Sequence, residues 1–259
     1  MGETAKCPHC GGDGFVTYER NSVSFARRCS CYDEARLRGV AERSQIPLEY
    51  RAASFDNFDI SGDNNPIARR ALAKVLVDVK GFLRDFRPAA KRPGLLLIGP
   101  PGVGKTHLAV AALQEIIRRG FAGIFYNYTT LLQQIRAGYD PASNVSNREA
   151  YRTALDCEVL LLDDLGAHRV TDWVEDTVTE IITHRCNFGK PLIATTNLRE
   201  PVINENLIER RTVPLTPEQY QQTLADRLGA RAFSRLYEMC TIIRMPVVED
   251  YRKRTANIR

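Results

Sequence analysis

After residue 90 the chain alternates short apolar runs with longer stretches that have helical patterning. Short uninterrupted apolar runs predict buried strands, and they lie at 94–98, 159–162, 191–197 and 240–245. Helix patterns or helix start and stop signals lie between them, at 107–119, after a capping box at Thr130–Gln133, and at 172–188. Strands that alternate with helices predict an α/β fold, in which a parallel sheet has helices on both faces.

A longer amphipathic stretch precedes the last predicted strand. Thr216, Pro217 and Gln219 have the residue types of a helix start, and the pattern predicts one helix from 216 to about 238. Its buried stripe recurs every four residues, at Leu224, Leu228, Ala232 and Leu236. Arginines recur at the same interval on a neighbouring face, at Arg227, Arg231 and Arg235. One arginine there would be solvated surface, whereas three in register indicate an anion, either a neighbouring subunit's nucleotide or nucleic-acid phosphate.

Four of the seven cysteines lie in the first 31 residues, with C-x2-C spacing at Cys7 and Cys10 and C-x-C spacing at Cys29 and Cys31. In a cytosolic chain this spacing favours a metal over disulfides, and four thiolates supply the tetrahedral shell of a structural Zn²⁺ site. His9 is an alternative ligand. A redox pair or unrelated buried thiols are the other readings, but glycines follow Cys10 where a redox pair needs a helix.

The cysteines are followed by a charged, helix-forming stretch at 33–43 and then by an extended segment interrupted by proline and glycine. Tyr50, Phe55 and Phe58 in that segment are expected to dock it on the domain that follows. We therefore predict three parts of the chain: a zinc-binding domain at 1–45, a linker at 46–66, and the α/β domain at 67–259.

The strongest motif is GPPGVGKT, which fits G-x-x-x-x-G-K-[ST] and stands between a predicted strand and a predicted helix. Its glycines let backbone N–H groups converge on phosphates at the helix N-terminus. Lys105 reaches the β- and γ-phosphates, and the Thr106 hydroxyl binds Mg²⁺. The motif therefore predicts ATP binding by Gly99, Pro100, Pro101, Gly102, Val103, Gly104, Lys105, Thr106 and His107.

Two carboxylates end the apolar run at 159–162. Asp163 is the predicted second Mg²⁺ ligand, and Asp164 is predicted to orient or deprotonate the attacking water. Two acids in an ordinary turn are the alternative, which the phosphate-loop motif disfavours. Glutamate is the usual second acid in such ATPases, so the shorter Asp164 is expected to slow hydrolysis or to require an intervening water. Asn197 ends the next predicted strand, where a polar side chain positions water beside the phosphates.

The composition, 44% hydrophobic and 26% charged, excludes a disordered, collagen-like or coiled-coil chain. The sequence has no run of about 20 apolar residues and no apolar signal-peptide region, so we expect a cytoplasmic protein without membrane contact. The net charge is +5, and the residues from Arg227 onward hold eight basic and three acidic side chains, 8 − 3 = +5. This local surplus is a weak indication of nucleic acid and equally of a slightly basic surface.

Together the motifs resemble the bacterial replicative helicase loaders of the DnaC/DnaI type, which are AAA+ ATPases. The resemblance covers nearly the whole chain, through the cysteine cluster, IPLEYRAASFDNF, GPPGVGKTHLA, VLLLDDLGA, IATTNL and LADRLGARAFSRL. The ATPase motifs are equally similar to the IstB-type ATPases that assist transposition, whereas the cysteine cluster and the linker favour a loader. The implied fold is an AAA+ core with a small N-terminal zinc-binding domain.

The resemblance also implies residue roles. Asn197 matches the sensor I position, and Arg235 matches the arginine finger that reaches a neighbour's γ-phosphate. Arg231 is a second arginine nearby, and Arg252 matches a late arginine near the nucleotide. The sequence departs from the family pattern at Asp164 and in a long loop at 199–215, whose arginines have no assigned role: Arg199, Arg210 and Arg211.

The function implied by the resemblance is ATP-dependent loading of the replicative DNA helicase, a hexameric ring, onto single-stranded DNA. It requires ATP, Mg²⁺ and Zn²⁺, self-assembly through the ATP sites, docking of the N-terminal domain on the helicase, and DNA binding by the ATPase domain. A transposition helper ATPase and a non-hydrolysing, ATP-switched adaptor are the alternatives.

Overall fold

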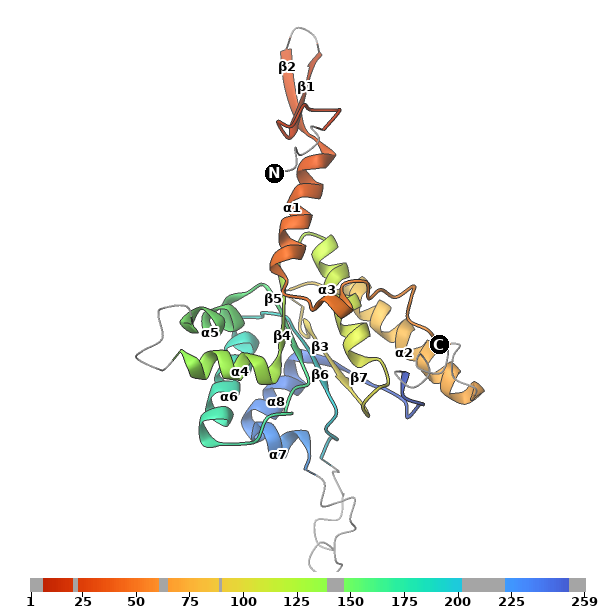
Figure 1. The fold of residues 1–259 in the computed structure, drawn as a ribbon, viewed down its shortest axis with the longest axis vertical. Helices are drawn as coiled ribbons and strands as arrows, with labels where there is room; N and C mark the ends of the chain where they lie inside the picture. The colour runs from red at the N-terminus through yellow and green to blue at the C-terminus, as the bar shows by residue number, and fades with distance from the viewer. Residues whose placement is uncertain are drawn as a thin grey trace, which may run out of the picture.

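The computed structural model describes residues 7–20, 23–60, 65–88, 90–138, 147–201 and 222–251. Its N-terminal part is a hairpin of β1 (Phe15–Arg20) and β2 (Val23–Arg28), followed by α1 (Ser30–Arg43) and a short 3-10 helix, η1 (Leu48–Tyr50). In Figure 1 the hairpin and α1 project from a globular body that contains the remaining helices and strands.

The body alternates helices and strands along the chain. Its elements are α2 (Pro66–Asp85), β3 (Gly94–Ile98), α3 (Lys105–Arg118), β4 (Gly123–Asn127), α4 (Tyr128–Ala137), α5 (Asn147–Asp156), β5 (Val159–Asp163), α6 (Asp172–Asn187), β6 (Leu192–Thr196), α7 (Leu224–Leu228), α8 (Ala230–Met239) and β7 (Cys240–Arg244). The five strands form one parallel sheet in the order β4-β5-β6-β3-β7, which confirms the predicted α/β class. No helix of the described ranges is long and apolar enough to cross a membrane.

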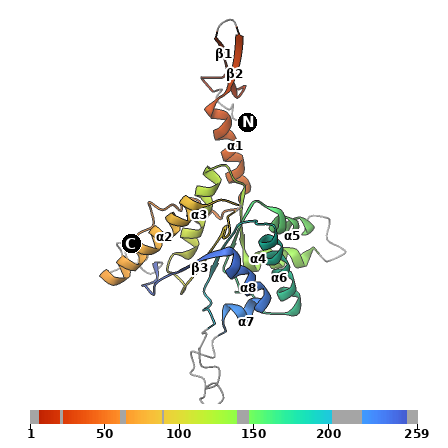
Figure 2. The same cartoon turned by 180° about the vertical axis from the view of Figure 1, so that it is seen from behind.

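Helices cover both faces of the sheet. Because side chains alternate along each strand, neighbouring residues of one strand pack into different cores. Leu95 and Leu97 of β3 pack in a core with α2 and α3, whereas Leu96 and Ile98 pack in a second core with α4, α6 and α8. Figures 1 and 2 show these helix layers on opposite sides of the sheet. All five residues of β3, β5 and β6 are buried, as strands enclosed by helices require.

The segment between α1 and α2 packs against the α2–α3 core. Phe58 is buried in that core, and Tyr50 and Phe55 pack against it. The side chain of Gln114, on α3, donates hydrogen bonds to the carbonyls of Tyr50 and Arg51. The prediction that these aromatic residues dock the segment on the following domain is therefore confirmed.

Two local predictions were wrong. The helix α4 is capped by Asn127, whose side chain accepts hydrogen bonds from the backbone of Thr129 and Thr130, so a capping box at Thr130–Gln133 does not start it. The single helix expected over 216–238 is two helices, since Gly229 separates α7 from α8 with a φ of 78°. Thr223 forms a capping box with Asp226 at the start of α7. Residues 216–221 lie outside the described ranges.

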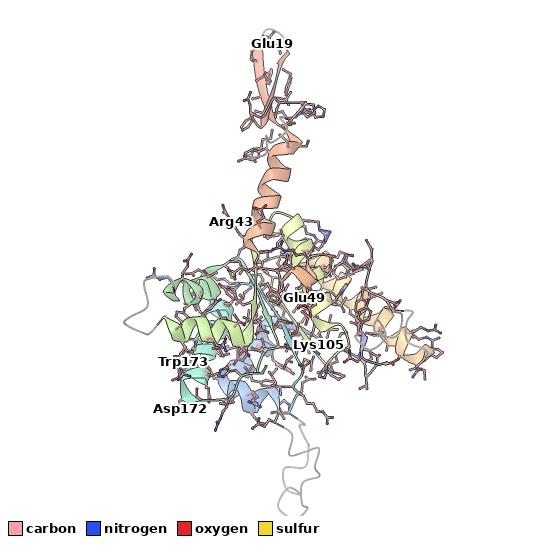
Figure 3. All side chains as sticks on the ribbon, viewed as in Figure 1. Glu19, Arg43, Glu49, Lys105, Asp172 and Trp173 are labelled. Carbon is pink, nitrogen blue, oxygen red and sulfur yellow. The ribbon has the colours of Figure 1, made fainter. Side chains whose placement is uncertain are left out.

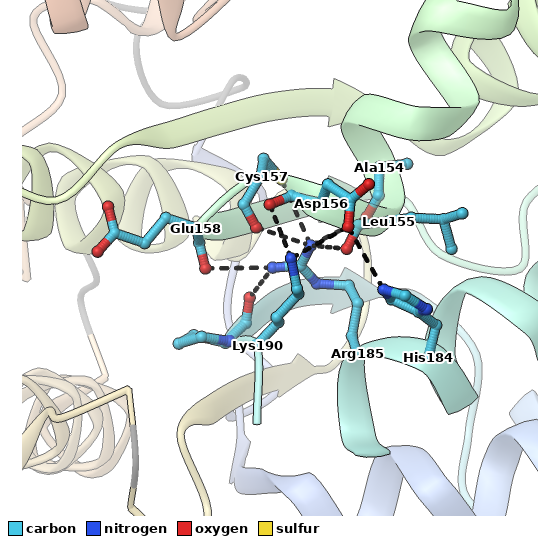
Figure 4. Close-up of polar contacts among 9 residues, drawn as sticks. Ala154, Leu155, Asp156, Cys157, Glu158, His184, Arg185 and Lys190 are labelled. Atoms are coloured by element: carbon cyan, nitrogen blue, oxygen red, sulfur yellow. Dashed lines mark hydrogen bonds and ion pairs between the residues drawn. The ribbon is translucent and has the colours of Figure 1, made fainter. Parts of the chain in front are cut away.

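A buried arginine ties together the amino ends of β5 and β6. Arg185, on α6, is fully buried, and its guanidinium donates hydrogen bonds to the carbonyls of Ala154, Cys157 and Pro191 at 2.9, 3.1 and 2.6 Å (Figure 4). Burial lowers the pKa of Arg185. These carbonyls end α5 and precede the two strands, so the side chain supplies donors that regular structure lacks there.

Candidate functional site

The phosphate-loop motif forms the turn between β3 and α3. Gly102 and Gly104 have φ of 76° and 90°, a conformation that glycine adopts without strain. Lys105 begins α3 and is only 5% exposed, and its Nζ donates a hydrogen bond of 2.7 Å to the Pro100 carbonyl. Figure 3 shows Lys105 within the body, far from Glu19 at the hairpin tip. The backbone N–H groups at the start of α3 and a buried ammonium group therefore meet where a phosphate chain fits.

Asp163 ends β5 beside this loop and is 6% exposed. Its Oδ1 accepts hydrogen bonds from the hydroxyls of Thr106, at 2.9 Å, and Thr195, at 2.7 Å. Burial raises the pKa of Asp163, while the bonds from the two threonines act in the opposite direction. A buried carboxylate beside a hydroxyl is a donor set that suits Mg²⁺, so the two residues predicted from sequence to bind the metal are adjacent.

Asp164 and Asn197 meet on the same edge. The side-chain amide of Asn197 donates to Asp164 Oδ1 at 3.2 Å, and the Asp164 backbone N–H donates to the Thr195 hydroxyl at 3.0 Å. Asp164 has a φ of 57°, in the left-handed region, which aspartate tolerates better than most side chains. This conformation gives a physical reason for aspartate at this position.

The sequence reasoning missed Thr195, which contacts both acids of the site. Its hydroxyl donates to Asp163 and accepts from the backbone of Asp164, and it is fully buried. The sequence feature that could have indicated Thr195 is the pair of threonines, Thr195 and Thr196, at the end of an otherwise apolar strand. Because β5, β6 and β3 are neighbours in the sheet, their carboxyl ends bring Asp163, Thr195 and the phosphate loop together.

Two segments from outside the motif also line the loop. A Cβ on Gly104 would lie 2.6 Å from Phe58 Cε2, and a Cβ on Gly102 would meet the Asp250 carboxylate. The Tyr251 backbone donates to the Gly102 carbonyl at 2.9 Å, and His107 Nε2 lies 2.8 Å from the Ser54 carbonyl. Glycine is therefore favoured at Gly104 by the close approach of the buried Phe58 ring as well as by φ, and at Gly102 by φ.

The three C-terminal arginines are not in register on one helix. Arg227 lies on α7 and donates to the His168 carbonyl at 3.1 Å, whereas Arg231 and Arg235 lie on α8. Arg231 is exposed, and Arg235 forms an ion pair with Glu238 at 2.6 Å with 41% of its side chain exposed. The stripe of Leu224, Leu228, Ala232 and Leu236 is fully buried despite the break at Gly229. Arg252, Arg210 and Arg211 lie outside the described residues.

The four N-terminal cysteines converge at the base of the hairpin. Their Sγ atoms all lie within 4.8 Å of one another, with Cys7 and Cys29 separated by 3.7 Å and Cys10 and Cys31 by 3.3 Å. Four thiolates bound to one Zn²⁺ at ~2.3 Å are separated by about 3.8 Å, so the cluster fits this ion. The contact between Cys10 and Cys31 lowers the pKa of Cys10 to about 7 and raises the pKa of Cys31, as expected for two thiols that share one proton. His9 is not part of the cluster.

Comparison with known proteins gives consistent matches over the body. Residues 83–257 match the family of IstB-like ATP binding proteins. The chain is 30% identical over 195 residues to a putative ATP-binding protein in an insertion sequence of Mycobacterium tuberculosis, covering 72% of this chain and 70% of that one. It is 27% identical over 153 residues to the replicative helicase loader DnaI of Bacillus subtilis, covering 59% of this chain but only 46% of DnaI.

Among solved structures, the crystal structure of the DnaC helicase loader aligns with a TM-score of 0.59 at 30% identity, over 77% of this chain and 100% of that one. The fold of the body is that of the AAA+ ATPases. The similar proteins thus include both a helicase loader and an ATP-binding protein of an insertion sequence.

Proposed function

Because the chain belongs to the family of IstB-like ATP binding proteins, we propose that it hydrolyses ATP and uses this cycle to load the replicative DNA helicase onto single-stranded DNA. The observation that carries the ATPase part is the meeting of Lys105, Thr106, Asp163, Asp164 and Asn197 at one edge of the sheet. The loader part is supported by the likeness to the DnaC structure and by the N-terminal cysteine cluster.

Each residue of the edge has a task in this proposal. Lys105, now bonded to the Pro100 carbonyl, would bind a phosphate oxygen, and Thr106 and Asp163, now bonded to each other, would hold Mg²⁺. When bound, Mg²⁺ supplies the positive charge that offsets charge developing on the phosphates. Asp164 holds the attacking water, and Asn197 fixes the orientation of the Asp164 carboxylate.

We further propose that a neighbouring subunit completes the site with Arg235. The ion pair with Glu238 is largely exposed and therefore weak, so Arg235 can leave it for a γ-phosphate at low cost. Arginines supplied in trans raise phosphoryl-transfer rates by about 10³- to 10⁵-fold. Arg231, exposed one helical turn before Arg235, is a second candidate for the same interface.

The domain assignment follows from the same proposal. Residues 1–45 hold Zn²⁺ through Cys7, Cys10, Cys29 and Cys31 and dock on the helicase, 46–66 form the linker, and 67–259 form the ATPase and bind DNA. A loader acts where the chromosome is replicated, so the proposal includes a cytoplasmic location. Metal analysis of the purified chain should find one Zn²⁺ per molecule, and a chain that folds with only traces of metal would contradict the zinc assignment.

The loader proposal is tested with the host's replicative helicase on single-stranded DNA coated with single-strand-binding protein. Wild-type chain and ATP should allow the helicase to unwind a downstream duplex, whereas Lys105→Ala should not support unwinding. Arg84→Ala, which changes an exposed arginine on α2, should behave as wild type. Unwinding that is independent of the chain, or equal for Lys105→Ala, would contradict an ATP-dependent loader.

The transposition helper is the second candidate, and it is favoured by the family match and by the relative in an insertion sequence. A paired pull-down against the replicative helicase and any transposase encoded nearby separates the two, since a helper binds the transposase and not the helicase. A non-hydrolysing adaptor would bind ATP but show no turnover with or without single-stranded DNA.

A further inference from the structure

The hairpin carries an unusual exposed aromatic pair. Tyr18 lies opposite Phe25 in the register of β1 and β2, and their rings stack at 5.6 Å with an interplanar angle of 20°. Tyr18 is 50% exposed and Phe25 is 44% exposed. Every residue of β2 is exposed, so this ribbon has no core of its own to cover the rings.

The charges on the same face are complementary to an anion. Side chains alternate along a strand, so Val16 and Tyr18 share one face of the hairpin with Phe25 and Arg27. Residues 15–28 contain three arginines and a single acid, Glu19, whose register position belongs to the opposite face. On that opposite face Arg28 lies over the Tyr32 ring, 5.5 Å from its centroid.

The hairpin is held away from the sheet by α1, as Figures 1 and 2 both show. The fourteen residues of α1 give a helix roughly 21 Å long. The aromatic face is therefore distant from the phosphate loop and is not part of the ATP site.

The size of the face restricts what it binds. Six-residue strands paired in a two-stranded ribbon offer a face on the order of 20 by 10 Å. A stable protein–protein interface needs about 800 Å² from each partner, roughly four times this area. One or two nucleotides fit such a face, and exposed rings flanked by arginine are the usual means of holding unpaired bases.

We propose that this face binds single-stranded DNA by stacking bases on Tyr18 and Phe25, with Arg27 contacting the phosphates. The site is separate from the ATPase domain and needs no nucleotide. The hairpin then keeps hold of the strand while the ATP site is empty, a task that the loader proposal does not assign to any residue. Its failure would leave the ATPase and loader proposals standing, because their tests depend on Lys105 and Arg235.

The affinity test uses the full-length, zinc-loaded chain without nucleotide and a fluorescent dT oligonucleotide, measured by anisotropy. Tyr18→Ala combined with Phe25→Ala should weaken binding by roughly 5- to 100-fold, since a base–aromatic stack is lost. Tyr18→Phe combined with Phe25→Tyr keeps both rings and should bind as wild type. Phe188→Ala, which removes a 68% exposed ring from the body, is the matched control and should have no effect. Arg27→Ala should lower the salt slope by about 0.7.

A crosslinking test locates the bases without any substitution. An oligonucleotide containing 5-iododeoxyuridine should, on irradiation, join to Tyr18 or Phe25, as peptide mapping would show. Crosslinks confined to residues 66–251, or unchanged affinity in the alanine pair with zinc retained, would overturn the proposal. So would unchanged DNA affinity with lost helicase binding, because that result assigns the face to a protein.

Discussion

The two edges of the central sheet both bury charged side chains, but they use them differently. At the amino edge, the Arg185 guanidinium is fully buried, and its oxygen partners are backbone carbonyls (Figure 4). At the carboxyl edge, Asp163 is bonded by the side chains of Thr106 and Thr195, which come from two other elements.

The contacts of Arg185 therefore suit a structural role, whereas the contacts of Asp163 suit a binding role. The carbonyls that bind Arg185 belong to the backbone at the end of α5 and before the two strands. Arg185 cannot exchange these partners unless that backbone moves, so its contacts are fixed by the fold. Side-chain hydroxyls rotate, so the bonds of Asp163 can be exchanged for a metal without moving the backbone. The raised pKa of Asp163 shows that its surroundings do not fully compensate the buried charge, which is a common property of ligand-binding sites.

The substitution Asp163→Asn should have the largest effect, and that effect is on the rate of ATP hydrolysis. Mg²⁺-dependent turnover should fall by about 10²- to 10³-fold, because a neutral amide cannot balance the positive charge of the metal ion. Burial raises the pKa of Asp163, so the folded, nucleotide-free chain holds that proton more tightly than the unfolded chain. Stability therefore falls as pH rises from the usual carboxyl pKa to that of Asp163, and stays lower above it.

The amide introduced by Asp163→Asn does not ionise, so at pH 7 the nucleotide-free variant should be at least as stable as wild type. Urea denaturation at several pH values checks this, with exposed Asp176→Asn on α6 as the control. A marked loss of stability at pH 7 would show that the carboxylate has a structural role like that of Arg185.

At the opposite edge, Arg185→Met should cost about 3 kcal/mol of unfolding free energy, since several buried carbonyls lose their donor at once. Turnover per folded molecule should not change. Urea denaturation and ATPase assays measure the two quantities, and Arg118→Met, on the exposed side of α3, should cost less than about 1 kcal/mol. A stable Arg185→Met variant with impaired turnover would contradict the purely structural role of Arg185.

Thr195→Val tests the residue that joins the two acids. Valine has the same shape but no hydroxyl, so Asp163 loses a donor, its pKa rises further, and the Mg²⁺ concentration for half-maximal turnover should increase about 10-fold. Thr196→Val removes a bond to the Leu165 carbonyl instead and should affect stability but not the Mg²⁺ dependence. Equal Mg²⁺ dependence in both variants would exclude a specific role for Thr195.

The smallest effect is expected for Asp164→Glu. The φ of 57° favours aspartate or asparagine, so glutamate should lower the unfolding free energy by about 1 kcal/mol. Asp164→Asn keeps the conformational preference and should be as stable as wild type while losing turnover. Thermal denaturation of both variants is sufficient, and an Asp164→Glu variant as stable as the wild type would show that the backbone does not select aspartate.

Most of the carboxyl edge was predictable from sequence because its residues lie in contiguous motifs. GPPGVGKT and the two acids after 159–162 each combine a strand with the polar residues that end it, and parallel strands bring such ends together. Thr195 was missed because a threonine in an apolar strand has no periodic signal of its own. Arg185 was missed for a related reason, since its partners are carbonyls that leave no trace in the sequence.

The C-terminal region shows where periodicity misleads. Leu224, Leu228, Ala232 and Leu236 recur every four residues and are all buried, yet Gly229 interrupts the helix between them. The prediction of a buried stripe was therefore correct. The prediction that Arg227 lies in register with Arg231 and Arg235 on one helix was wrong. The β1–β2 hairpin was not predicted, and every residue of β2 is exposed, so this strand has no buried face of the kind that the sequence pattern was searched for.

The central claim, an ATP site completed by a neighbour's Arg235, is tested most directly by mixing two inactive variants. Lys105→Ala has an intact finger and a defective loop, and Arg235→Ala has the reverse. Each alone should lose ATP turnover, and an equimolar mixture should recover it, because some interfaces combine an intact loop with an intact finger. The recovered turnover should depend on total protein concentration, because the active interface forms between two molecules. A mixture as inactive as its components, with Arg235→Ala still binding ATP, would contradict it, as would full turnover by Arg235→Ala alone.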